Sequence, residues 1–250
     1  MLSKNKLKLI RSLESKKKRK EEGLFVAEGP KLVGDLLGHF PAKVIVATAS
    51  WLSQHKAEEG CEYIEVTQEE LSKASFQKTP QEVLALFEQP AYKYSNEIAK
   101  EELCLALDDV QDPGNLGTII RIADWFGIHH IFCSVGTVDV YSPKTVQATM
   151  GALARVKVHY LDLPPFLSSL QDSPLYGTFL DGEVIYSEKL SKHGIIVMGN
   201  EGKGVSPAVE KCLNKRLYIP NYPAEVESSE SLNVAVATAI VCAEFRRKLI

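Results

Sequence analysis

Hydrophobic and polar positions follow two alternating rhythms along the chain. Short apolar runs, each ended by a polar or glycine-containing turn, predict buried strands. Between them, apolar residues recur three and four positions apart, as on one face of a helix. The predicted strands are residues 24–27, 44–47, 63–66, 83–87, 103–107, 131–134, 156–160, 176–180, 195–198 and 217–219. Strands that alternate with helices indicate an α/β fold with a parallel sheet covered on both faces.

The predicted helices fill the intervals between these strands. Residues 4–20 form the first, with Leu7, Ile10 and Leu13 on one side. Thr67 is the expected N-cap of another helix. The remaining helices are residues 31–37, a segment from 50, 116–126, 142–154, 164–170, a segment from 206, and 234–248.

A polar stretch at residues 89–100 has no clear periodicity and interrupts the alternation of strands and helices. We therefore predict a small α/β domain at residues 1–90, a linker at 91–101 and a larger α/β domain at 102–250. A chain of 250 residues with 45% hydrophobic content can form two such cores.

Charge is distributed unevenly. The net charge is −3, yet residues 1–20 hold nine Lys and Arg residues and one Glu, a net +8, which leaves −11 for the rest. This asymmetry favours a basic contact surface on an acidic protein, centred on Lys16, Lys17, Lys18, Arg19 and Lys20. The alternative is a helix face that is simply solvated.

Several classes of protein are disfavoured. No apolar run approaches the roughly 20 residues of a membrane span, and the lysine-rich N-terminus lacks the apolar core of a secretory signal. Five cysteines, without a CxxC pair and mostly in apolar surroundings, predict buried thiols and a reducing cytoplasm. The six histidines have no ligand spacing, so we expect no metal site.

The first candidate for chemistry is the stretch 108–121. At about 100° per residue, its helix directs Leu116, Ile119, Ile120, Ala123 and Phe126 to the core. Arg121 falls nearly opposite, with Thr118 and Trp125 beside it, and Asn115 is a plausible N-cap. A partner subunit or a ligand would cover this face; alternatively, the Arg121 stem lies on Trp125.

Two more candidates come late in the chain. The loop 199–204 follows a strand, and its glycines allow close backbone approach; it matches neither the dinucleotide fingerprint nor the P-loop. A generic tight turn is equally compatible. Ser231 opens the last helix, either as its cap or as a site residue, and Asn233 is placed just inside it. Such loops gather polar groups at the edge of a parallel sheet where α/β proteins bind ligands.

Together, residues 112–121, 197–204, 219–220 and 231–237 resemble the three motifs of the SpoU-type branch of the SPOUT superfamily, the RNA 2′-O-ribose methyltransferases. The resemblance covers about residues 102–250. Residues 25–29, after the basic helix, are similar to the family's small RNA-binding domain, which is related to a ribosomal protein fold. The resemblance implies a trefoil knot in the catalytic domain, S-adenosylmethionine bound in the knot, and a homodimer through that domain.

The resemblance also implies roles for individual residues. Arg121 would act at the methyl transfer, with Asn115, Glu201, Ser231 and Asn233 orienting it and the ribose. The cofactor would be bound by Gly199, Ile219, Leu232, Leu180, Met198, Asn200 and Gly202. Lys16, Lys17, Lys18, Arg19 and Lys20 would contact RNA. The loop 221–230 is longer and more acidic than in many relatives.

These observations predict an S-adenosylmethionine-dependent RNA 2′-O-methyltransferase, with ribosomal RNA as the first candidate substrate and transfer RNA as the second. A catalytically inactive RNA-binding relative is the main alternative from another class. A nucleotide-dependent oxidoreductase is disfavoured because neither domain has a GxGxxG after its first strand.

Overall fold

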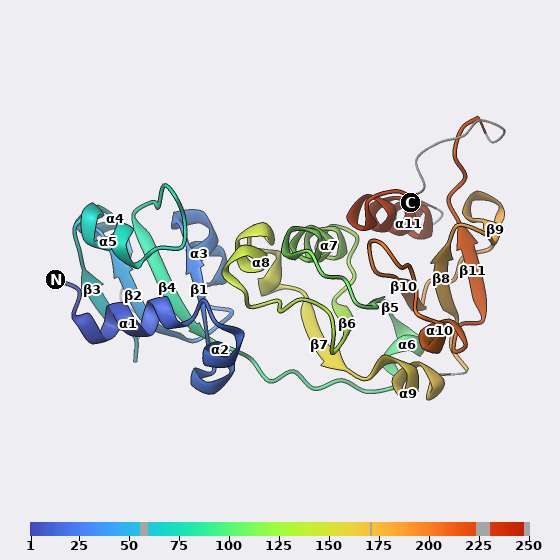
Figure 1. Cartoon of the computed structure of the whole chain (residues 1–250), viewed down its shortest axis with the longest axis horizontal. Helices are drawn as coiled ribbons and strands as arrows, with labels where there is room; N and C mark the ends of the chain where they lie inside the picture. Colours follow the sequence, from blue (N-terminus) through green and yellow to red (C-terminus); the bar gives the residue numbers. More distant parts are fainter. Residues whose placement is uncertain (56–59, 171, 224–230, 248–250) are drawn as a thin grey trace. The chain divides into compact units, whose positions relative to one another are not determined.

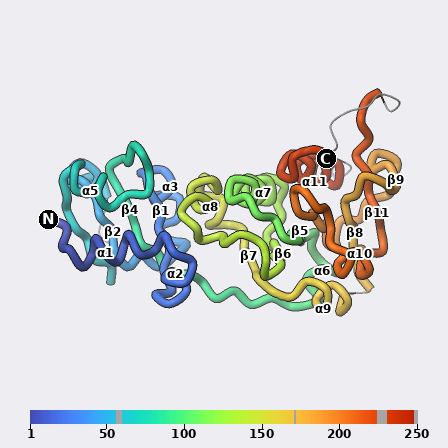
Figure 2. Tube along the Cα trace, viewed as in Figure 1, coloured from blue at the N-terminus to red at the C-terminus, as the bar shows by residue number. Residues whose placement is uncertain are grey.

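The chain forms two units, and the first is built from two separate stretches of sequence. The computed structural model describes residues 1–55, 60–170, 172–223 and 231–247. Unit 1 comprises Met1–Ala91 and Asp139–Ala154; unit 2 comprises Tyr92–Val138 and Arg155–Ile250. Figure 2 traces the path of the chain through both units.

Unit 1 contains a four-stranded mixed sheet in the order β1-β4-β2-β3. The strands are β1 (Leu24–Glu28), β2 (Ala42–Ala47), β3 (Glu62–Glu65) and β4 (Val83–Glu88). Strand β4 is antiparallel to β1 and β2, whereas β3 is parallel to β2. The helices are α1 (Lys4–Ser12), α2 (Lys16–Glu22), α3 (Pro30–Leu36), α4 (Ala49–Gln54) and α5 (Gln68–Ala74). The predicted Thr67 cap of α5 is confirmed as a capping box with Glu70.

The single helix predicted at residues 4–20 is wrong, since α1 and α2 are separate helices (Figure 1). Helix α1 ends because the buried Leu13 turns into the core. The carbonyls of Leu13 and Glu14 then lack helical partners, and Arg19 Nη1 donates to them at 2.8 and 2.7 Å. Helix α2 ends at Gly23, which is in the left-handed conformation.

The second stretch of unit 1 comes from the sequence predicted to be the catalytic domain. It holds α8 (Pro143–Ala148) and the 3-10 turn η1 (Ala152–Ala154). The Tyr141 ring lies 5.0 Å from the Phe25 ring, and Gln77 donates to Gln147. The predicted helix 142–154 is shorter than expected because Met150 and Gly151 adopt positive φ, which a right-handed helix does not allow.

Unit 2 contains a seven-stranded sheet in the order β7-β6-β5-β10-β8-β11-β9, in which every pairing is parallel, as predicted. Its strands are β5 (Leu103–Leu107), β6 (His130–Ser134), β7 (Lys157–Leu161), β8 (Leu175–Phe179), β9 (Glu183–Val184), β10 (Gly194–Met198) and β11 (Lys215–Tyr218).

Helices cover both faces of this sheet. They are α6 (Ile98–Glu101), α7 (Pro113–Trp125), α9 (Leu163–Ser168), α10 (Pro207–Glu210) and α11 (Val234–Arg247), with the 3-10 turn η2 (Ile185–Ser187). Helices α7 and α11 pack together on one face, and α6, α9 and α10 lie on the other (Figure 1). The last helix starts where the sequence predicts; residue 248 lies outside the described residues, as do residues 224–230 of the predicted acidic loop.

Four of the five cysteines are buried, as their apolar surroundings predict. Burial raises the pKa of the Cys104 and Cys242 thiols to about 12, which keeps them protonated and unreactive at neutral pH. Among the helices of the described residues, none combines the length and apolar character needed to cross a bilayer.

Candidate active site

Helix α7 presents the face that its sequence predicts. Leu116, Ile119, Ile120 and Ala123 are fully buried, whereas Phe126, also predicted to face the core, is half-buried at the C-cap. Arg121 is exposed and Trp125 is 83% exposed on the other side. Among the described residues the Arg121 guanidinium neither stacks on the Trp125 ring nor forms a hydrogen bond. The cation is therefore free to meet an anionic ligand.

The start of α7 differs from the prediction. Its N-cap is Asp112, not Asn115: Asp112 Oδ1 accepts from the Asn115 N–H at 2.9 Å, and Pro113 occupies the first helical position. With the cap supplied by Asp112, the Asn115 side chain is left for other partners.

Asn115 joins the three motif stretches in one chain of hydrogen bonds. Its Nδ2 donates to Glu201 Oε1 at 3.0 Å, and its Oδ1 accepts from Asn233 Nδ2 at 3.0 Å. These residues belong to α7, to the loop after β10 and to the turn before α11. The structure therefore brings together Asn115, Glu201 and Asn233, which lie far apart in the sequence.

Glu201 accepts several hydrogen bonds at the start of α7. Besides Asn115, the backbone N–H groups of Gln111 and Asp112 donate to its carboxylate at 3.1 Å each. Partial burial would raise the pKa of Glu201, but the hydrogen bonds from Asn115 and from backbone N–H groups outweigh that effect and lower it. Glu201 is thus ionised at neutral pH and suited to orienting Asn115, rather than to accepting a proton.

Asn233 is the residue that caps α11, which corrects the prediction of Ser231 as a cap and of Asn233 as lying inside the helix. Asn233 Oδ1 accepts from the N–H groups of Ala235 and Val236 at 3.0 and 3.3 Å. Its amide nitrogen is thereby directed at Asn115. Ser231 is exposed, and no hydrogen bond recorded between described residues links it to Asn115, Glu201 or Asn233.

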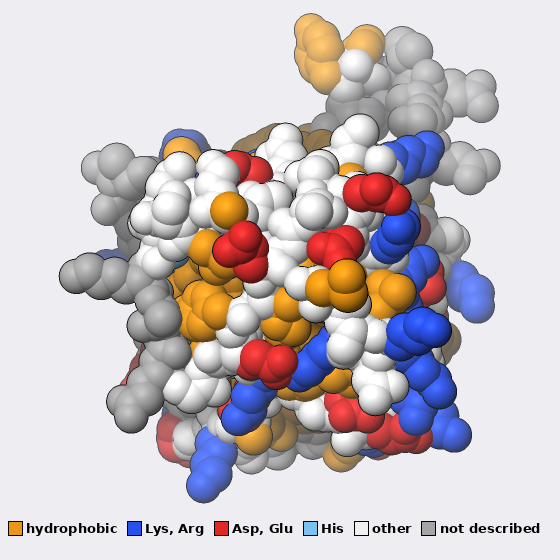
Figure 3. All heavy atoms as spheres, turned by 90° about the vertical axis from the view of Figure 1, so that its left-hand side faces the viewer, with side chains coloured by type: hydrophobic (Ala, Val, Ile, Leu, Met, Phe, Trp, Pro, Cys, Tyr) orange, Lys and Arg blue, Asp and Glu red, His pale blue; other side chains and the backbone are white. Residues whose placement is uncertain are grey.

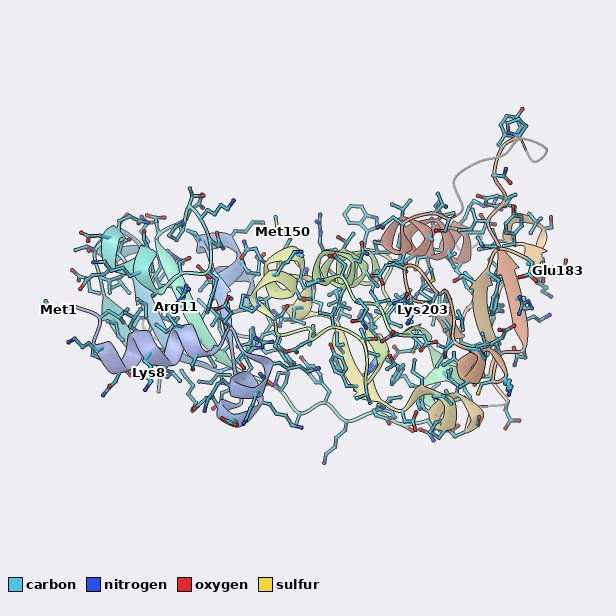
Figure 4. All side chains as sticks on the ribbon, in the orientation of Figure 1. Met1, Lys8, Arg11, Met150, Glu183 and Lys203 are labelled. Carbon is cyan, nitrogen blue, oxygen red and sulfur yellow. The ribbon has the colours of Figure 1, made fainter. Side chains whose placement is uncertain are left out.

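The glycine loop after β10 is closed by its own backbone. Asn200 and Gly204 exchange two backbone hydrogen bonds of 2.9 Å. The Asn200 side chain accepts from Gly202 and Lys203 N–H groups and donates to the Asp109 carbonyl. A Cβ on Gly199 would lie 2.2 Å from the Gly204 carbonyl carbon, so only glycine fits there. Asn200 therefore holds the loop, whose Lys203 is labelled in Figure 4.

The predicted cofactor residues gather by topology. Leu180, Gly199 and Ile219 directly follow β8, β10 and β11, which are neighbours in the parallel sheet, so they share its carboxyl edge. Leu180 is 69% and Leu232 47% exposed. The Met198 side chain, by contrast, is buried, with its sulfur beside the Thr178 hydroxyl.

Asp108 is a supporting residue that the sequence analysis missed. It is buried directly after β5, and its Oδ2 accepts from the Ser206 N–H at 2.7 Å. This bond holds the end of the glycine loop next to the start of the α7 stretch. The sequence signal that could have identified Asp108 is an acidic residue directly after a buried strand.

Unit 1 holds the predicted RNA-contacting residues. Lys16, Lys17, Lys18 and Lys20 are exposed. Arg19 is 3% exposed; its Nε and Nη2 donate to Asp139 Oδ2 at 2.9 and 2.5 Å, in addition to its bonds to the backbone after α1. Because these partners occupy the guanidinium, we remove Arg19 from the RNA-contacting set.

The fold and the site define an α/β protein with a hydrogen-bonded polar cluster and exposed apolar side chains at the carboxyl edge of a parallel sheet. Residues 102–243 match the SpoU rRNA Methylase family, and residues 4–85 match the MRM3-like substrate binding domain. The chain belongs to the SpoU rRNA methylase family, as the three motifs predicted.

Relatives align over almost the whole chain. The 23S rRNA (guanosine(2553)-2′-O)-methyltransferase RlmP of Bacillus subtilis is 32% identical over 96% of this chain and 96% of its own. Human mitochondrial rRNA methyltransferase 3 is 26% identical over 95% of this chain and 70% of its own.

Solved structures agree with these relatives. A Porphyromonas gingivalis protein assigned to the TrmH family of RNA methyltransferases has a TM-score of 0.92 at 44% identity and covers 99% of both chains. An AdoMet-bound rRNA methyltransferase from Sinorhizobium meliloti has a TM-score of 0.87 at 33% identity, over 100% of this chain and 97% of its own.

Proposed function

We propose that the protein is an S-adenosylmethionine-dependent RNA 2′-O-ribose methyltransferase that acts on ribosomal RNA. The observation that carries the proposal is the Glu201–Asn115–Asn233 hydrogen-bonded chain, on the helix that also exposes Arg121. The 23S rRNA activity in the name of the Bacillus relative supports ribosomal RNA over transfer RNA.

The carboxyl edge of the sheet fits S-adenosylmethionine. Exposed Leu180 and Leu232 offer apolar surface for the adenine ring, and Gly199 and Ile219 offer backbone atoms at the ends of adjacent strands. Met198 and Gly202 remain proposed cofactor-binding residues because their backbone atoms can contact the cofactor. Asn200 remains one because it holds the glycine loop in place. The bound cofactor would supply an electrophilic methyl group on a sulfonium; the protein supplies position and electrostatics.

Arg121 is the proposed catalytic residue. An Arg side chain is effectively always protonated, so it does not serve as a general base. Its planar fork can bind the phosphate next to the target ribose and stabilise negative charge on the 2′-oxygen, while the phosphate or water takes the proton. Glu201 fixes Asn115, which fixes Asn233, and Ser231 completes the proposed group around the ribose.

The exposed side of α7 and α11 is the proposed dimer surface. Trp125 is 83% and Val236 50% exposed on two helices that pack together, and the homodimer that the family resemblance implies would cover both side chains. We also propose the trefoil knot, which the family resemblance supports. The two family matches support the functional division at the linker 91–101. A ribosomal RNA substrate favours a cytoplasmic location for the protein.

The proposed activity is tested with purified protein, tritium-labelled S-adenosylmethionine, and ribosomal and transfer RNA from cells that lack the gene. We expect label in large-subunit ribosomal RNA, at one nucleotide that resists alkaline cleavage on its 3′ side, as a 2′-O-methyl group does. Label in transfer RNA would support the second substrate. Calorimetric binding of S-adenosylmethionine and RNA without transfer would support the inactive RNA-binding alternative.

A further inference from the structure

Unit 1 has a small open hollow that no step of the proposed reaction uses. It lies where β1 meets α3, and α8 supplies its opposite wall. Its volume is about 100 Å³, and all of its lining belongs to unit 1. The lining residues are Glu28, Gly29, Pro30, Lys31, Leu32, Gln81, Gln147 and Met150.

The size of the hollow limits what can enter it. A volume of about 100 Å³ holds roughly three water molecules, well below the several hundred Å³ typical of sites for free small molecules. A ligand that inserts only one ring or one edge must be held mainly by contacts elsewhere. A large polymer with protruding flat groups meets this condition.

The polar groups of the hollow suit the edge of a nucleobase. Gln81 and Gln147 each carry an amide, which offers a donor and an acceptor side by side. Gln147 Oε1 accepts from Gln77 Nε2 at 2.9 Å, and its own amide nitrogen has no partner among the described residues. Met150 is 52% exposed at a positive φ of 50°, an uncommon conformation that sets an apolar side chain at the rim. Such a side chain can cover the face of a base.

Contacts connect the hollow to positive charge on α1. The hydroxyl of Ser75 donates to the Glu28 carboxylate, and the Phe76 N–H donates to Glu28 Oε1 at 2.9 Å. Arg11 Nη1 donates to the Ser75 carbonyl at 2.6 Å, and its guanidinium lies 4.9 Å from the centre of the Phe76 ring. Loop 75–77 therefore joins α1 to the wall of the hollow.

Helix α1 carries exposed cations on one side. Lys4, Lys8 and Arg11 are spaced four and three residues apart, which places them in one row. Lys8, Arg11 and Met150 are labelled in Figure 4. Figure 3 shows Lys and Arg side chains gathered along one margin of this end of unit 1. Rows of cations of this kind bind the backbone of nucleic acids.

We propose that the hollow receives one unpaired base of the RNA substrate, with Gln81 and Gln147 bonded to its edge, while Lys8 and Arg11 contact phosphates of the same strand. Sequence-specific binding of RNA usually uses unpaired bases in loops and bulges, because their edges are accessible. The inference rests on the proposed function and assigns unit 1 the selection of the RNA.

The test compares a Gln81→Ala/Gln147→Ala double variant with Gln54→Ala, which removes an exposed amide of unit 1 outside the hollow. The probe is large-subunit ribosomal RNA from cells that lack the gene. We expect the double variant to bind this RNA on the order of tenfold more weakly, as for the loss of one paired amide–base contact. One unpaired base, protected from chemical modification at its pairing edge by the wild type and by Gln54→Ala, should lose that protection.

Salt dependence separates base contacts from phosphate contacts. The double variant should keep the wild-type slope of log K against log salt, because the amides are neutral. Lys8→Gln should lower the slope by roughly 0.7 and keep the base protected. Unchanged affinity, unchanged protection, or a changed salt slope in a folded double variant would overturn the proposal. RNA binding and chemical probing need no cofactor. If the base is protected only when the hollow is intact but no methyl group is transferred, the proposed catalysis is refuted and the hollow proposal stands.

Discussion

The two units use polar side chains in opposite ways. In unit 2, Glu201, Asn115 and Asn233 bond to one another and to helix N-termini, so their geometry is set before any ligand arrives. In unit 1, the lysines of α2 and the Gln81 side chain are exposed, and the half-buried Gln147 has an amide nitrogen without a partner among the described residues. A reaction at one oxygen atom needs fixed groups, whereas a large RNA needs an accessible surface that can adapt.

Two arginines show a similar contrast, but here the residue held by fixed partners is in unit 1 and the accessible residue is in unit 2. Arg19 of unit 1 is buried, and its guanidinium donates four hydrogen bonds to described residues. Arg121 of unit 2 is exposed and has no partner among the described residues. The first therefore stabilises the fold and the second is available for chemistry, although both belong to stretches that look functional in the sequence.

Loss of Arg19 should have the largest effect. Arg19→Ala would leave the Asp139 carboxylate, which is 13% exposed, without its cationic partner and with the Tyr141 N–H as its remaining donor among the described residues; loss of one partner of a buried ion pair typically costs about 3–5 kcal/mol of stability. Lys18→Ala, on the exposed side of the same helix, should change stability by less than about 0.5 kcal/mol. Urea unfolding of both variants measures the difference. Equal stability of the two variants would contradict the structural role of Arg19.

Arg121 should affect the rate rather than stability. Arg121→Ala should lower single-turnover methylation about a hundredfold or more, as for a lost donor to developing charge. Arg121→Lys, which keeps the charge without the planar fork, should recover only part of it. Binding of S-adenosylmethionine should remain near the wild-type level in both. A Lys variant with full turnover would show that the fork is not used.

Asn233 caps α11 and donates to Asn115, and two variants separate the cap from the proposed positioning role. Asn233→Ala should lose about 1 kcal/mol of stability together with activity. Asn233→Asp keeps an acceptor for the α11 N–H groups but cannot donate to Asn115, so its stability should stay near wild type. Its rate should nevertheless fall roughly five- to tenfold, as for one lost hydrogen bond. If the Asp variant were fully active, the Asn115 contact would be structural only.

The smallest change is expected at the surface of α2. Replacement of Lys16, Lys17, Lys18 and Lys20 by Gln should weaken RNA binding in proportion to the number of phosphates contacted. Each lost contact lowers the slope of log K against log salt by roughly 0.7–0.9. Cofactor binding and thermal stability should not change. A salt titration with an unaltered slope would leave these lysines as a solvated helix face.

The sequence predicts features that depend on local periodicity. The buried face of α7, the parallel strands of unit 2 and the Thr67 cap all follow from spacing over a few residues. The family motifs also identify Asn115, Glu201 and Asn233, although their hydrogen bonds to one another could not be derived from spacing.

The errors arise where neighbouring residues compete or where distant contacts decide. Asp112 and Asn115 are both good caps, and Pro113 in the first helical position decides for Asp112. The basic helix predicted at residues 4–20 is interrupted where Leu13 enters the core, and Arg19 then bonds to the carbonyls after α1 and to a carboxylate 120 residues away. The position of residues 139–154 in unit 1 depends on the same long-range contacts and has no local signal.

The insertion of residues 139–154 into unit 1 has a consequence for synthesis of the protein. Asp139 is translated 120 residues after Arg19, so at roughly 5–20 residues per second it follows by about 6–24 s. During that interval the nascent N-terminal segment has neither Asp139 nor the Tyr141 ring to complete it. We therefore expect unit 1 to complete its packing only after residue 154 has left the exit tunnel.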